Sequence, residues 1–153
     1  MVEAHDNADI ADDETLIRRI DPENHFSWDH DRQAQRLSTK AFSSSSQPPY
    51  GMSVDVLGLM RSAQIDPVAF VTSPKYTGSV AFPAGVARGV GMRVGYDPLD
   101  ATATDPANPY HAEIWGNPKP EKFSKAQQKA LMSACNWFVE IPNELWLNLG
   151  DAA

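Results

Sequence analysis

The longest uninterrupted apolar segments of this chain are only a few residues long, as at residues 68–71. A membrane-spanning helix needs about 20 mostly apolar residues, so no segment predicts a bilayer span. Such segments are typical of short strands and short helices, and here the two kinds mix without the regular rhythm of βαβ units. We therefore expect an α+β fold: a single compact domain with a small, mostly antiparallel sheet and a C-terminal amphipathic helix.

The pattern of apolar and polar residues predicts several short elements. The segment Thr15–Ile20 is a short helix or strand that ends before Pro22, because the residue before a proline avoids the helical region. Residues 23–50 are predicted to be a long functional or mobile loop around a brief strand at residues 41–42. We then expect a helix over 53–64, a hairpin of strands over 67–72 and 78–82, a helix after Pro83 that ends at Gly89 or Gly91, and a strand over Met92–Tyr96.

Residues 110–115 alternate between apolar and polar side chains and predict a strand. One face would carry His111, Glu113 and Trp115, and the other Tyr110, Ala112 and Ile114. A capping-box pattern at Ser124 and Gln127 then predicts the start of the amphipathic helix, which Pro142 ends. Residues 145–149 alternate as an edge strand or a packing arm.

The negative charge is unevenly distributed. The formal net charge is −7, but six acidic residues and no Lys or Arg precede Leu16, whereas the rest of the chain carries 14 acidic and 13 basic residues. Like charges with little to bury predict a disordered acidic leader over 1–14, followed by one domain over 15–153. We expect removal of the leader to leave folding intact, and we expect binding neither to nucleic acid nor to a membrane.

The single cysteine and the N-terminus both favour a reducing compartment. Cys135 has no second cysteine with which to form an internal disulfide, and its place near the end of a helix indicates packing rather than thiol chemistry. The N-terminus lacks the basic start and apolar centre of a secretory signal. We therefore expect a cytoplasmic protein.

An ordered series of short segments resembles a group of small bacterial proteins of unassigned function. The segments are residues 16–20, 38–42, 53–55, 82–85 and 108–116, followed by an alanine-rich helix that ends at Trp137. This resemblance covers nearly the whole domain. It implies one domain with an optional N-terminal leader, and no particular activity.

One set of residues also resembles the Arg…Ser/Thr…Glu arrangement of ADP-ribosyltransferase-like enzymes, which use NAD. The resemblance implies that Arg18 or Arg19 holds a phosphate, that Ser38 organises the nicotinamide side, and that Glu113, beside His111, binds the ribose and stabilises positive charge at its anomeric carbon. The sequence departs from that pattern, because it has no small residue after the arginine, a lysine where a second serine is expected, and a single Glu on the late strand. The alternative is that these residues have no such function: two arginines on the surface, a serine in a loop, and a His/Glu pair on the face of a sheet.

No metal site is predicted. His25, His30, Asp29, Asp31 and His111 offer imidazole and carboxylate ligands, but histidines five residues apart do not share a helix face, and no cysteine lies near them. We interpret this stretch as a solvated loop with local charge pairs.

The leading hypothesis is therefore a module that binds a protein or small-molecule partner. The residues expected to contribute are His111, Glu113 and Trp115 on the strand face, and Lys122, Lys125 and Lys129, whose spacing places them on one helix face. The alternative hypothesis is an ADP-ribosyltransferase-like enzyme with NAD as its cofactor. Ordinary packing and a solvated helix face would explain the same residues without any function.

Overall fold

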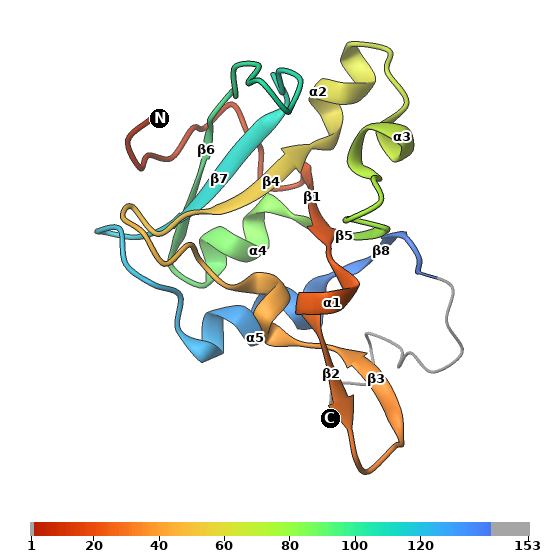
Figure 1. Ribbon diagram of the computed structural model, residues 1–153. Helices are drawn as coiled ribbons and strands as arrows, with labels where there is room; N and C mark the ends of the chain where they lie inside the picture. The colour runs from red at the N-terminus through yellow and green to blue at the C-terminus, as the bar shows by residue number, and fades with distance from the viewer. Residues whose placement is uncertain (1, 142–153) are drawn as a thin grey trace.

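A six-stranded antiparallel sheet forms the centre of the protein. The computed structural model describes residues 2–141. The order of the strands in the sheet is β6-β7-β4-β1-β5-β8, and β2 and β3 form a separate hairpin that projects from the domain (Figure 1). The strands are β1 (Thr15–Ile20), β2 (Phe26–Asp29), β3 (Ala34–Leu37), β4 (Met52–Val56), β5 (Gly78–Pro83), β6 (Met92–Tyr96), β7 (His111–Gly116) and β8 (Asn136–Val139).

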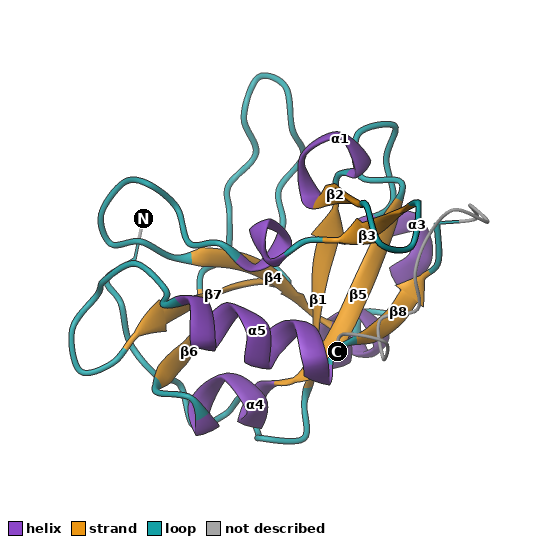
Figure 2. Ribbon diagram, turned by 90° about the horizontal axis from the view of Figure 1, so that it is seen from below, coloured by secondary structure: helices purple, strands orange, loops and turns teal. Residues whose placement is uncertain are grey.

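Helices pack on both faces of this sheet. In Figure 2, α4 and α5 lie side by side against one face, where the larger part of the core is buried. The opposite face carries a smaller apolar cluster around Ile17, which packs against residues of α2 and α3. The helices are α1 (Pro22–His25), η1 (Thr39–Phe42), α2 (Leu57–Ser62), α3 (Pro67–Val71), α4 (Ala84–Gly89) and α5 (Lys125–Ala134).

These elements confirm the predicted α+β class and several of its parts. Strands β6 and β7 form where alternation predicted them, and β7 buries Ala112 and Ile114 in the main core. Helix α5 begins with the predicted capping box, in which the Ser124 hydroxyl accepts from the Gln127 backbone N–H and the Gln127 side chain accepts from that of Ser124. The segment 145–149 lies outside the described residues.

Between residues 52 and 72, two predicted elements are wrong. Residues 67–72 are not a strand but helix α3, because the Asp66 carboxylate accepts a hydrogen bond from the Val68 backbone N–H and Pro67 suits the first helical position. The predicted helix over 53–64 starts only at Leu57. Before it, β4 directs Met52 and Val54 into the core and leaves Ser53 on the opposite side.

Residues 23–50 contain more regular structure than the expected loop. They form α1, the β2–β3 hairpin and η1, where we expected only a brief strand at residues 41–42; Ala41 and Phe42 belong to η1, and both are buried. The hairpin pairs Phe26 with Leu37 and Asp29 with Ala34.

The N-terminal segment, residues 2–14, lies against the domain, although we expected a disordered leader. Ile10 is completely buried in the main core. The Arg88 guanidinium of α4 donates to the Asp6 and Asp12 carboxylates at 2.9 and 2.8 Å and to the Ile10 carbonyl at 2.6 Å. A cation on the domain thus neutralises two of the acidic groups whose repulsion suggested disorder.

None of the helices within residues 2–141 combines the length and apolar character that crossing a bilayer requires.

Candidate functional site

The candidate site begins where β1 and β4 separate. Their antiparallel register covers only Leu16 opposite Val56 and Ile17 opposite Asp55. Beyond this point the Arg18 guanidinium makes two hydrogen bonds: its Nε donates to the Ala41 carbonyl at 2.8 Å, and its Nη1 donates to the Ser53 carbonyl at 3.0 Å. The Arg18 side chain therefore joins β1 to β4 here through one hydrogen bond and to η1 through the other.

A cleft of about 500 Å³ opens over this gap; we call it the β1/β4 cleft. Its lining combines cationic, carboxylate, hydroxyl, amide and aromatic groups from β1, α1, β4, α3, β7 and the two loops that precede β5 and β7. The lining residues are Arg18, Arg19, His25, Ser53, Asp55, Ala69, Phe70, Tyr76, Leu99, Asp105, Pro106, Asn108 and His111.

The two arginines of β1 have different surroundings. Arg19 is paired, since its Nε lies 3.0 Å from the Asp55 carboxylate and its guanidinium lies over the Phe70 ring. Asp55 also accepts from the Asn108 amide at 2.8 Å. Arg18, by contrast, is half-buried, its two hydrogen bonds go to neutral carbonyls, and it makes no ion pair within residues 2–141. Burial lowers the pKa of Arg18, and the attraction of Tyr76, Glu113 and Asp55 opposes that change.

Ser53, His111 and Glu113 lie on one face of β4 and β7. Ser53 is opposite Glu113 in the register, and its hydroxyl donates to Glu113 Oε1 at 3.3 Å. Burial raises the pKa of Glu113, while His111, Ser53 and Arg18 act in the opposite direction. Gly51 permits the carboxylate to lie here, because a Cβ at that position would be 2.6 Å from Glu113 Oε2.

His25 is held neutral at the edge of the cleft. The Asp21 backbone N–H donates to its Nδ1 at 2.9 Å, a bond that requires an unprotonated nitrogen. Burial, helped by the nearby Arg18 cation, lowers the pKa of His25 to about 4.

The structure therefore brings Arg18, Arg19 and His111 to the wall of one cleft, with Glu113 beside them. Ser38 is not among the residues that line it; its hydroxyl instead accepts the Lys40 backbone N–H and caps η1. Ser53, which the sequence interpretation placed at the start of a helix, occupies the position between Arg18 and Glu113. The sequence signal that could have placed Ser53 on this face of a strand was the alternation of apolar and polar residues over 52–56.

Trp115 does not offer a binding surface. Only 1% of it is exposed, and the His5 ring of the N-terminal segment lies 5.3 Å from it. The position of Trp115 on the polar face of β7 was predicted correctly, but the segment expected to be disordered covers it.

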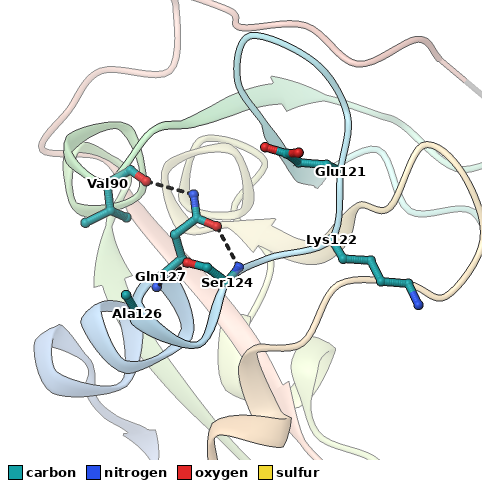
Figure 3. A pocket seen from close by; sticks show the side chains of 6 residues that line it. All are labelled: Val90, Glu121, Lys122, Ser124, Ala126 and Gln127. Atoms are coloured by element: carbon teal, nitrogen blue, oxygen red, sulfur yellow. Dashed lines mark hydrogen bonds between the residues drawn. The ribbon is translucent and has the colours of Figure 1, made fainter.

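The three lysines are all exposed, but they do not share one helix face, because α5 starts at Lys125 and Lys122 precedes it. A shallow hollow of about 540 Å³ lies at this helix start (Figure 3). The Gln127 amide spans it by donating to the Val90 carbonyl and accepting from the Ser124 N–H, and Lys122 points away. The polar groups of this hollow thus serve the capping box, and we do not treat it as a ligand site.

The fold class is thereby established: one α+β domain whose candidate site lies in a gap of its antiparallel sheet. No family model, no curated protein and no solved structure is similar to this chain at a significant level. The function must therefore be inferred from the site itself.

Proposed function

We propose that the protein is a binding module for a small anionic ligand of the phosphate-ester class, which it holds in the β1/β4 cleft. One observation carries this proposal: the half-buried Arg18 guanidinium borders the cleft and, within residues 2–141, donates hydrogen bonds to neutral carbonyls only. A cation removed from water is costly unless an anion pairs with it. Guanidinium groups bind phosphate through parallel, charge-assisted hydrogen bonds, so a phosphate is a suitable partner.

The other groups of the cleft support an ester of phosphate rather than the free anion. Phe70 and Tyr76 offer aromatic surface for a planar group. Ser53 and Asn108 donate to Glu113 and Asp55, and they still offer a hydroxyl oxygen and a second amide N–H for the polar atoms of a sugar. Ligand sites of small molecules typically combine such an apolar wall with a few placed polar groups.

Isothermal titration calorimetry with three probes tests this proposal: inorganic phosphate, AMP and ADP-ribose. We expect binding of at least one nucleotide, and we expect Arg18→Met to weaken it about tenfold or more, as the loss of a charge-assisted hydrogen bond implies. Arg61→Met, which removes an exposed arginine of α2 outside the cleft, is the matched control and should bind like the wild type. Equal affinity of a folded Arg18→Met variant, or no binding of any probe, would refute the proposal.

A second candidate is the ADP-ribosyltransferase-like enzyme, and one observation favours it. Ser53 contacts both other members of an Arg–Ser–Glu set, since its carbonyl accepts from Arg18 and its hydroxyl donates to Glu113. In such an enzyme Glu113 would stabilise positive charge on the ribose of NAD while nicotinamide leaves. The set differs from the one predicted, because Ser53 stands in it rather than Ser38.

Release of nicotinamide from NAD separates the two candidates. Turnover that is lost in Glu113→Gln would support the enzyme, whereas nucleotide binding without turnover would leave the binding module. That the protein acts in the cytoplasm, and that it has a protein partner, remain predictions from the sequence.

A further inference from the structure

We propose that Asp97, His111 and Glu113 form a binding site for a divalent transition-metal ion such as Zn²⁺, a site that goes beyond the proposed binding of an anionic ligand. One His111 nitrogen and one carboxylate oxygen each from Asp97 and Glu113 lie within 4.8 Å of one another. Asp97 directly follows β6, and the other two residues lie two apart on β7. A single imidazole with two carboxylates is a donor set that suits Zn²⁺ or Mn²⁺.

The state of the His111 ring provides an independent observation. Its Nδ1 lies 2.7 Å from the Asp97 carbonyl oxygen, which can accept a hydrogen bond only from a protonated Nδ1. The neutral ring therefore carries its lone pair on Nε2. A histidine that binds a metal commonly donates its other N–H to a carbonyl or carboxylate in this way, and the bond fixes the orientation of the ring.

Two atoms of the cluster lack partners. His111 Nε2 and Glu113 Oε2 are buried and make no hydrogen bond within the described part of the chain. The His111 side chain is only 6% exposed. Buried polar atoms without partners are rare in folded proteins, and a bound ion is one of the recognised explanations.

The distances accommodate an ion. His111 Nε2 lies 3.8 Å from Glu113 Oε1. With Zn–N and Zn–O bonds of about 2.1 Å, an ion between these two atoms would subtend an angle of roughly 130°, so neither atom has to move. The Asp97 carboxylate, whose side chain is 9% exposed, is the third candidate ligand. Its Oδ2 lies 3.7 Å from His111 Nδ1, so this side chain has to turn toward Nε2 to reach the ion. The two carboxylates balance the charge of a divalent ion.

The cluster also has an entry path, because His111 is one of the residues that line the β1/β4 cleft. The sequence did not predict this site, since it combined His111 with His25, His30, Asp29 and Asp31 rather than with Asp97 and Glu113. Its local signal was the His-x-Glu pair of β7, which places both side chains on one face of the sheet.

The test is titration of the metal-free, full-length protein with Zn²⁺ by calorimetry, together with the visible absorption of bound Co²⁺. We expect one ion per chain and a rise in the melting temperature. The isosteric variants Glu113→Gln and Asp97→Asn should each weaken the affinity tenfold or more, in line with the loss of a ligand. Asp100→Asn, which alters an exposed carboxylate outside both the cluster and the cleft, should bind like the wild type.

Unchanged affinity in the folded Glu113→Gln and Asp97→Asn variants, or no uptake by the wild type, would overturn the proposal. No nucleotide is present in these measurements, so their outcome is independent of the proposed function. Glu113→Gln and Asp97→Asn preserve the size and shape of the side chains they replace, and circular dichroism confirms that each variant is folded.

Discussion

Substituting Ile10 by alanine is expected to destabilise the protein strongly, although the residue lies in the acidic N-terminal segment. Its side chain is completely buried among residues of the main core. Replacing a buried isoleucine by alanine costs about 2–5 kcal/mol, because apolar contacts are lost and a cavity remains. For a chain of this size, a loss of about 3 kcal/mol lowers the melting temperature by about 6–12 °C.

Urea unfolding at pH 7, followed by circular dichroism, measures this change, and the slope of the transition shows whether the denatured state has altered. Val68→Ala is the matched control: Val68 is 46% exposed, so its truncation should change stability by less than about 0.5 kcal/mol. Arg88→Met should also destabilise the protein, because it removes the cation that holds Asp6 and Asp12.

The opposite result would refute the reasoning. If Ile10→Ala cost less than about 0.5 kcal/mol, or if deletion of residues 2–14 left the melting temperature unchanged, this segment would not be part of the folded unit in solution. The expectation of a disordered leader would then stand.

Three further predictions concern α1 and α5. The folded pKa of His25, about 4, lies below the ordinary value of 6.5, so the unfolded chain binds a proton first as the pH falls. The free energy of unfolding should therefore decrease by about 1–2 kcal/mol between pH 6.5 and 4, allowing for solvent screening. In urea titrations at several pH values, His25→Asn should remove that part of the dependence of stability on pH. Ser124→Ala should cost about 1 kcal/mol by removing the cap of α5, whereas Ser133→Ala, at an exposed position of the same helix, should be neutral in the same unfolding assay. Burial raises the pKa of Cys135 from 9.0 to about 12, so at pH 8 the native thiol holds roughly a thousandfold less thiolate than the unfolded one. A disulfide reagent should modify it more slowly by up to about that factor, and equal rates would contradict its burial.

The sequence predicted best those elements that depend on neighbouring residues. Alternation was sufficient for β6 and β7, and the capping box was sufficient for the start of α5. The errors occurred where two local signals competed. Residues 67–72 have strand-forming side chains, but the cap provided by Asp66 and the preset φ of Pro67 favour a helix.

The sequence predicted less of the candidate site than of the fold. The sequence named Arg18, His111 and Glu113 as candidates from their residue types, and the fold places them near one another. It named Ser38 as the serine of this set, because nothing local indicates that Ser53 rather than Ser38 faces Glu113. That neighbourhood arises from the pairing of β4 with β7, whose partners are about 60 residues apart.

The sequence by itself determined the α+β class, the core face of β7 and the capped start of the helix at Ser124, since these follow from periodicity and from contacts within a few residues. The helix ends at Ala134 and residues 136–139 form β8, although the sequence predicted a helix that Pro142 ends. Only the tertiary structure decided that β1 and β4 separate around Arg18 and that Asp97 lies beside His111 and Glu113. It also decided that Ile10 is buried, in a segment that Arg88 binds through hydrogen bonds. Each of these features brings together side chains or strands that are distant in the chain. The fold buries those side chains, and burial then determines which charged groups lack a partner.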